Sequence, residues 1–134
     1  WVGGDSPSAL RRAALFGDAW YPTGVNSRYP LASTTQLSSA LDSLRRHSED
    51  AGRNPDQVAV ACSIGWYDDR EMHVLSNGER QGFTGSSHQI AEDILAYEDL
   101  GVRCLILGFE RDSLVETIDT MERFARDVLP LVCG

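Results

Sequence analysis

The chain has 134 residues, of which 42% are hydrophobic, enough for one domain with a modest core. Its formal net charge of -8 argues against a nucleic-acid partner, because proteins that bind the phosphate backbone usually present a basic face. No apolar run is long enough to cross a membrane, and the start lacks the pattern of a secretory leader. The composition therefore predicts a cytoplasmic protein with no membrane partner.

Apolar spacing divides the chain into short apolar runs, typical of strands, and longer amphipathic segments, typical of helices. The predicted strands are residues 1–2, 19–21, 58–66 and 104–109, and the predicted helices are residues 7–16, 33–51, 86–100 and 113–129. Each helix ends where a glycine or a proline follows it. An insertion at about residues 67–84 interrupts the third unit, and its Asn77-Gly78 pair is a hairpin-turn signal.

The predicted order is strand, helix, repeated four times within one domain, residues 1–134. Strands that alternate with helices indicate an α/β fold with parallel strands and right-handed crossovers. The apolar run at residues 104–109 suits a strand that is covered on both faces. Four units are half of a (β/α)8 barrel, although an open four-stranded α/β sandwich has the same periodicity. In both arrangements the outer strands have free edges.

The cysteines and histidines are candidates for reactive or metal-binding groups: Cys62, Cys104, Cys133, His47, His73 and His88. The cysteines are odd in number and widely spaced, so we expect reduced, buried thiols rather than disulfides or a metal site. No two histidines share a ligand spacing, so the sequence predicts no metal site and no acid–base role for them.

The helix starts differ from one another. Three helices begin with a serine that is followed three residues later by Gln or Glu, the pattern of a capping box: Ser33 with Gln36, Ser86 with Gln89, and Ser113 with Glu116. The first helix has Ser6 as a cap and Pro7 at its first position, but Ala9 stands where the box partner would be. Fewer of its first amide groups therefore have an internal acceptor, and free donors at a helix start attract anions.

Two glycines, Gly3 and Gly4, come directly before this helix. Without side chains there, a phosphate could reach the free amides and the hydroxyls of Ser6 and Ser8. The alternative is a tight glycine turn followed by an ordinary serine cap, and Asp5 argues against a phosphate unless its carboxylate turns away. The loops after the third and fourth strands, residues 83–86 and 110–113, form a rival anion site.

Several motifs, in order, resemble those of the luciferase-like monooxygenases, especially their branch of oxidoreductases that depend on coenzyme F420, a deazaflavin. WVGGDSPSALRRAALFGDAWYP resembles the segment from strand five to strand six of that family. AGRNPDQVAV resembles the approach to strand seven, GFTGSSHQIAEDILAYEDLGV with CLILGF resembles helix seven and strand eight, and DSLVETIDTMERFARDVLP is similar to the last helix. The resemblance covers nearly the whole chain.

The resemblance implies a (β/α)4 half of a TIM-type (β/α)8 barrel, namely strands five to eight. In that family the turn after strand five helps to hold the phosphate of FMN or coenzyme F420, which points to Gly3, Gly4, Asp5 and Ser6, with Thr23 as a weaker candidate. The implied function is that of an oxidoreductase or monooxygenase acting on a small organic substrate.

The first four strands of such barrels supply much of the ring pocket and have no counterpart in this sequence. The active site of the chain alone is therefore expected to be incomplete, and no catalytic residue is identified. The resemblance leaves two arrangements open. The chain either belongs with an amino-terminal half-barrel in an enzyme or is a non-catalytic half-barrel module that associates with a copy of itself or with another half.

Overall fold

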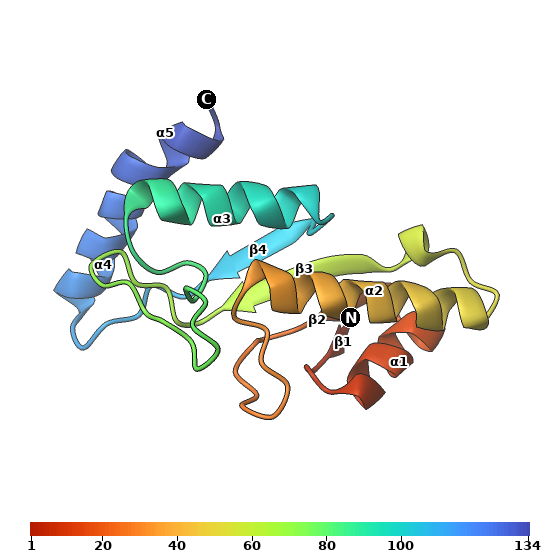
Figure 1. The fold of residues 1–134 in the computed structure, drawn as a ribbon. Coiled ribbons are helices and arrows are strands. Elements are labelled where there is room, and N and C mark those ends of the chain that lie inside the picture. The colour runs from red at the N-terminus through yellow and green to blue at the C-terminus, as the bar shows by residue number, and fades with distance from the viewer.

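A computed structural model describes residues 1–134, and it contains four strands that alternate with helices, as predicted (Figure 1). The strands are β1 (Val2–Gly3), β2 (Ala19–Tyr21), β3 (Ala59–Ile64) and β4 (Cys104–Leu107). The helices are α1 (Pro7–Phe16), α2 (Thr34–Asp50), α3 (Ser87–Asp99), α4 (Leu114–Arg123) and α5 (Leu129–Val132). A short 3-10 turn, η1 (Pro55–Gln57), precedes β3, and a π-helical stretch, η2 (Phe124–Val128), joins α4 to α5.

The four strands form one parallel sheet in the order β1-β2-β3-β4, which confirms the α/β fold. Trp20, Val60 and Cys62 belong to the core cluster on the helix side of the sheet. Side chains alternate between the two faces of a strand, so Ala61 and Ser63 face the opposite, inner side. None of the helices combines the length and the apolar character that a membrane crossing requires.

The expectation that the last strand is covered on both faces is wrong. Leu105 and Leu107 pack against the core, whereas Cys104 and Ile106 point to the inner face and are exposed. The cause is the position of β4 at the edge of a sheet whose helices cover one face only. An apolar strand of this kind indicates a surface that further protein covers in a larger assembly.

The fourth helix does not stop before Pro130 as predicted. The chain passes from α4 through the π-helical stretch η2 into α5, which contains Pro130 in its first turn. A proline is accepted there because the first-turn amides of a helix have no intrahelical acceptor. The proline therefore begins the last short helix instead of ending the preceding one.

Of the three predicted capping boxes, only the box at α3 is complete. Gln89 accepts a hydrogen bond from the amide of Ser86, and the hydroxyl of Ser86 accepts one from the amide of Gln89. At α2 the side chain of Gln36 reaches the amide of Ala32 instead, one residue before the cap. At α4 the Glu116 carboxylate accepts from the hydroxyl of the capping serine.

The insertion contains the predicted hairpin turn. Val74 and Arg80 form an antiparallel bridge, and the amide of Gly78 donates to the carbonyl of Leu75 at 2.9 Å. Gly78 has a φ of +86°, and Leu75 donates to Glu79 across the turn, so the loop is a three-residue turn with a glycine bulge. The insertion follows β3 and therefore lies at the carboxyl end of the sheet.

The cysteines are unpaired, as predicted, but only Cys62 is buried. Cys104 is exposed on the inner face at the sheet edge, and Cys133 is exposed beside the carboxyl terminus. Burial, followed by the negative charge of Asp5 and the nearby Cys104 thiol, raises the pKa of Cys62 to about 12. The Cys62 thiol therefore stays protonated well above neutral pH.

We expect the Cys62 thiol to be inert in the folded chain, because the thiolate is the reactive form and both burial and the raised pKa suppress it. Titration of thiols with a disulfide reagent near neutral pH should label the exposed Cys104 and Cys133 promptly and Cys62 only after denaturant is added. The double variant Cys104→Ser/Cys133→Ser serves as the control, since it removes both exposed thiols, and with them the fast reaction, without altering the slow one. Labelling of Cys62 at the rate of Cys133 in the native chain would contradict the expectation.

Candidate functional site

The turn between β1 and α1 requires one of its two glycines. Gly4 has a φ of +117°, and a Cβ added there would lie 2.9 Å from the Cβ of Ala9. Hydrogen bonds hold both the amide and the carbonyl of Gly4. The Gly4 amide donates to the carbonyl of Tyr21 at 3.2 Å, and the indole of Trp20 donates to the carbonyl of Gly4 at 2.9 Å. Gly4 is therefore explained by the fold itself.

Gly3 is different, because the chain has room for a side chain at this position. A Cβ on Gly3 would meet only the carbonyl oxygen of Tyr21, at the ordinary contact distance of 3.8 Å. Gly3 is exposed and pairs with Tyr21 on the inner face of the sheet, opposite the face that packs on the helices. The missing side chain thus leaves the inner face open at the end of β1, where a ligand could approach the backbone.

The start of α1 carries several polar donors that no group of the chain uses. The hydroxyl of Ser6 accepts from the amide of Ala9 at 3.2 Å and lies 3.0 Å from the hydroxyl of Ser8. The amides of Asp5, Ser6 and Ser8 donate to no acceptor within the chain. The first turn of α1 contains no acidic residue. This helix start therefore has the donors and the dipole direction that suit an anion.

The carboxylate of Asp5 turns away from the helix start and into the loop after β2. It accepts hydrogen bonds from the amides of Thr23 at 2.8 Å, Gly24 at 3.2 Å and Asn26 at 3.3 Å. The hydroxyl of Thr23 donates to it as well, at 3.3 Å. Asp5 is buried, with 7% of its surface exposed, and it joins the β1–α1 turn to the loop after β2.

The structure thus brings all five predicted site residues together but separates their roles. Gly3 is exposed, Ser6 is half-buried at the start of α1, and Gly4 shapes the turn. Asp5 and Thr23 are bonded to each other, so the hydroxyl proton of Thr23 is already used. Thr23 can accept a hydrogen bond from a ligand but cannot donate one while this contact persists.

In the rival anion site after β3 and β4 several donors are already in use, and the first turn of α4 contains the acidic Glu116. Arg111 donates to the carbonyl of Tyr67 at 2.7 Å and to that of Glu110 at 2.8 Å. The complete capping box at Ser86 uses the amides at the start of α3. Both features remove groups that a phosphate would need, so the start of α1 is the better candidate.

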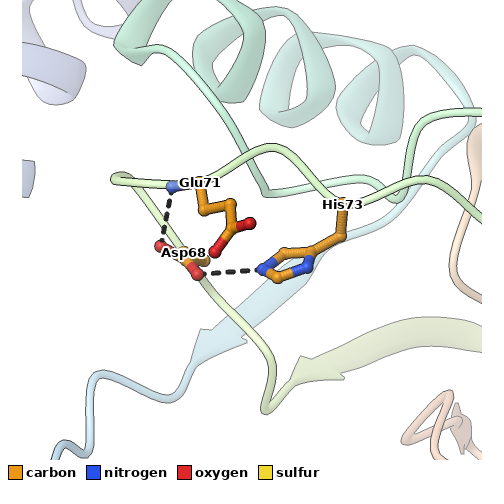
Figure 2. A group of neighbouring side chains, drawn as sticks. All are labelled: Asp68, Glu71 and His73. Carbon is orange, nitrogen blue, oxygen red and sulfur yellow. Dashed lines mark hydrogen bonds and ion pairs between the residues drawn. The ribbon is translucent and has the colours of Figure 1, made fainter.

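A cluster of possible metal ligands lies in the insertion, where the sequence predicted none. Asp68, Glu71 and His73 have ligand atoms within 4.8 Å of one another, and they point toward one another in Figure 2. One Asp68 oxygen accepts from the amides of Arg70 and Glu71, and the other lies 2.9 Å from Nε2 of His73. A turn closed by an aspartate, with a hydrogen bond between Asp68 and His73, accounts for this geometry without a metal.

The sequence did not predict this cluster, because ligand spacings were considered between pairs of histidines and not between a histidine and nearby carboxylates. The spacing of Asp68, Glu71 and His73 within one loop was the available signal. Partial burial raises the pKa of Asp68, but hydrogen bonds from His73 and from two amides outweigh it and hold the pKa below its ordinary value. A lowered carboxyl pKa stabilises the fold above the pKa of the unfolded chain, and that contribution is lost as the pH falls through the folded-state pKa.

The fold is that of about half of a TIM-type barrel, with four parallel strands, their helices, and a candidate phosphate site at the carboxyl end of the first strand. Solved structures of luciferase-like enzymes share this fold, which confirms the resemblance at the level of the fold. No protein-family model matches the sequence, and no curated protein matches it either.

Several similar structures have TM-scores above 0.5, among them two F420-dependent enzymes and an alkane monooxygenase. The coenzyme F420-dependent tetrahydromethanopterin reductase of Methanopyrus kandleri is 12% identical, with a TM-score of 0.66, over 96% of this chain and 49% of that one. An F420-dependent secondary alcohol dehydrogenase, solved with an F420-acetone adduct, is 15% identical, with a TM-score of 0.64, over 97% of this chain and 47% of that one. A long-chain alkane monooxygenase is 15% identical, with a TM-score of 0.57, over 96% of this chain and 39% of that one. The chain spans half or less of the length of these proteins.

Proposed function

We propose that residues 1–134 form one domain, the carboxyl-terminal half of a flavin- or deazaflavin-dependent oxidoreductase of the luciferase-like kind, and that this half binds the cofactor phosphate. The observation that carries the proposal is the start of α1. Its amides at Asp5, Ser6 and Ser8 are free, and the one nearby carboxylate is turned into the neighbouring loop. The similar structures, which include two F420-dependent enzymes and a monooxygenase, support the same class.

In this proposal each site residue has a distinct part. Gly3 leaves space for the phosphate, Gly4 forms the turn, and Ser6 donates its hydroxyl and amide. Asp5 positions the loop that carries Thr23, and Thr23 borders the site as an acceptor. The residues bind and orient the cofactor, and none of them transfers a proton.

The bound cofactor, coenzyme F420 or FMN, supplies hydride exchange with a small organic substrate, and FMN also supplies reaction with oxygen. Gly3 and Tyr21, on the inner face of the sheet, would be the part of the cofactor pocket that this chain supplies. The rest of the ring pocket would come from four further strand–helix units, because this chain spans about half of the barrels it resembles.

A fluorescence titration of the chain with coenzyme F420 and with FMN tests the proposal. We expect saturable binding of one of them, weakened about tenfold by Ser6→Ala, which removes one charge-assisted hydrogen bond worth roughly 1.5–3 kcal/mol. Gly3→Ala should also weaken binding while leaving stability near that of the wild type, because its Cβ meets no close contact within the chain.

Ser86→Ala is the matched control. It also removes a serine cap, at a typical cost of about 1 kcal/mol, but at the start of α3 and beside the rival site. Binding that survives Ser86→Ala and fails in Ser6→Ala supports the α1 site. The reverse result moves the phosphate to the loop before α3, and binding of neither cofactor at millimolar concentration contradicts the proposed function.

A further inference from the structure

A hollow of about 300 Å³ lies between α1 and α2, which Figure 1 shows next to each other. One end of the hollow is lined by Asp5 and by Pro7, the first residue of α1. It therefore begins beside Ser6, where the proposed phosphate site lies. We call this hollow the α1–α2 groove. Further along, it is lined by Leu10 of α1, Tyr29 of the loop before α2, and Ala40, Ser43 and His47 of α2.

The groove is open because the side of α2 that borders it carries small side chains. Ala40, Ser43 and His47 follow one another at spacings of three and four residues, so they lie on one side of the helix. The side chains of Ala40 and Ser43 are too short to fill the space beside α1. All walls of the groove come from residues 5–47, so it is separate from the exposed strand β4 at the sheet edge.

Cationic side chains border the groove although the chain has a formal net charge of -8. The guanidinium of Arg28 lies 5.7 Å from the centre of the Tyr29 ring, and Nη2 of Arg46 donates to the hydroxyl of Ser43 at 3.2 Å. Neither arginine pairs with a carboxylate. The one carboxylate that lines the groove, Asp5, already accepts four hydrogen bonds from the loop after β2. The groove therefore suits an anionic ligand.

The length of the groove indicates a chain rather than a single small ion. From Gln36 to His47, both of which line it, the axis of α2 rises about 16 Å. An extended peptide covers at most about 3.3–3.6 Å per residue, so several linked residues fit along the helix. His47 also lines the next hollow along the two helices, where Arg11 offers a further cation and Asp50 an opposing carboxylate.

The two candidate cofactors differ beyond the phosphate. The phosphate of FMN is terminal, so FMN has nothing to place in the groove. The phosphate of coenzyme F420 is a diester that continues into a lactate and a chain of glutamates. A phosphate held at the start of α1 would direct such a tail past Pro7, where the groove begins.

We propose that the α1–α2 groove binds the glutamate tail of coenzyme F420 and that the chain therefore prefers F420 to FMN. Arg28, held over the Tyr29 ring, and Arg46 pair with carboxylates of the tail, since a guanidinium can offer two parallel donors to a carboxylate. The inference rests on the proposed phosphate site, because the tail enters the groove from there.

A fluorescence titration of the chain with FMN and three deazaflavins tests the inference. The deazaflavins are F420 with its glutamates, the form that ends at the lactate, and the riboside that lacks the phosphate. We expect F420 with glutamates to bind about tenfold more tightly than the form that ends at the lactate, because two exposed ion pairs at the upper part of their usual range add to that factor. FMN should bind no more tightly than the lactate form.

Substitution of single arginines locates the tail. Arg28→Gln and Arg46→Gln should each weaken the binding of F420 about two- to fivefold and leave the binding of the lactate form unchanged. Arg45→Gln is the matched control, because it removes the same charge from the same helix, but Arg45 lines a different hollow between α2 and the end of α3. Ser6→Ala should weaken the binding of both forms by the same factor, since it acts at the phosphate.

The outcomes separate the inference from the proposed function. Equal binding of F420 with and without its glutamates, or equal effects of Arg45→Gln and Arg46→Gln, would overturn the inference and leave the phosphate site in place. If the riboside binds as tightly as the lactate form, or if no cofactor binds, the proposed function fails and the inference fails with it. Circular dichroism of each variant confirms that a loss of binding is not a loss of folding.

Discussion

Replacement of Asp93 by alanine is expected to lower the free energy of unfolding by about 3–5 kcal/mol, the usual cost of removing one partner of a buried ion pair. Arg80 reaches both Asp93 oxygens, with Nη2 at 2.5 Å from Oδ1 and Nη1 at 2.9 Å from Oδ2. The amide of Phe83 also donates to Oδ2, at 2.7 Å. Asp93 is buried, so the alanine variant leaves the Phe83 amide without its acceptor and leaves the Arg80 guanidinium with carbonyl acceptors only, among them that of Thr84 at 2.7 Å.

The same carboxylate holds a strained part of the backbone. Phe83 has a φ of +62°, a conformation that costs a residue with a side chain about 1–2 kcal/mol, and its ring is fully buried against the edge of the Tyr97 ring. Asp93, on α3, fixes both the hairpin of the insertion, through Arg80, and its last residues, through Phe83. Loss of Asp93 should therefore release the insertion as well as destabilise the domain.

Urea unfolding measures the decrease in the free energy of unfolding, and limited proteolysis within residues 67–84 measures the release of the insertion. Glu92→Ala is the control, because Glu92 is the neighbouring acid on α3 and is exposed, so its removal should change stability by no more than about 0.5 kcal/mol. Equal effects of the two substitutions would show that the Arg80–Asp93 pair contributes little and that the insertion is held by its apolar contacts.

The order of the elements could be predicted from the sequence because its causes are local. Helix α2 follows from apolar residues at helical spacing, with Ser33 as a cap, and the hairpin follows from Asn77-Gly78. Parallel pairing follows from the alternation of strands and helices, because a connection through a helix returns the chain in the same direction.

The remaining features depend on contacts between residues that are distant in the sequence. Asp69 pairs with Arg123, 54 residues later, at 2.7 and 2.9 Å, and no local pattern announces that pair. The exposure of Cys104 could not be predicted either, because an apolar strand has the same sequence pattern whether the next strand is present or absent. Local patterns thus identify the elements, whereas the uncovered edge follows only from the assembled sheet.

In the candidate site, the position of Asp5 could be predicted from the sequence, but the direction of its carboxylate could not. The sequence placed Asp5 in the glycine turn, and its charge argued against a phosphate there. Only the folded chain shows that the carboxylate accepts from three amides of the loop after β2. The first of these amides belongs to Thr23, 18 residues after Asp5. An acidic residue in the turn and an anion at the start of α1 are compatible for this reason.

Asp5→Ala is therefore expected to lower the free energy of unfolding by about 2–3 kcal/mol, because three amides lose a charged acceptor in a partly buried loop. It should also weaken cofactor binding, since Thr23 is no longer held beside the start of α1. Thr23→Val is the graded control. It removes only the hydroxyl contact at 3.3 Å and should cost less than about 1 kcal/mol.

Amide hydrogen exchange at Thr23, Gly24 and Asn26 provides the decisive readout for Asp5. If the carboxylate fixes the loop, these three amides exchange faster in Asp5→Ala, and the amides of Thr23→Val stay close to the wild type. Unchanged exchange in Asp5→Ala would mean that the loop is held by its own packing. The carboxylate would then be free to turn toward the start of α1, where its charge would repel a phosphate, so the same measurement also tests the proposed site.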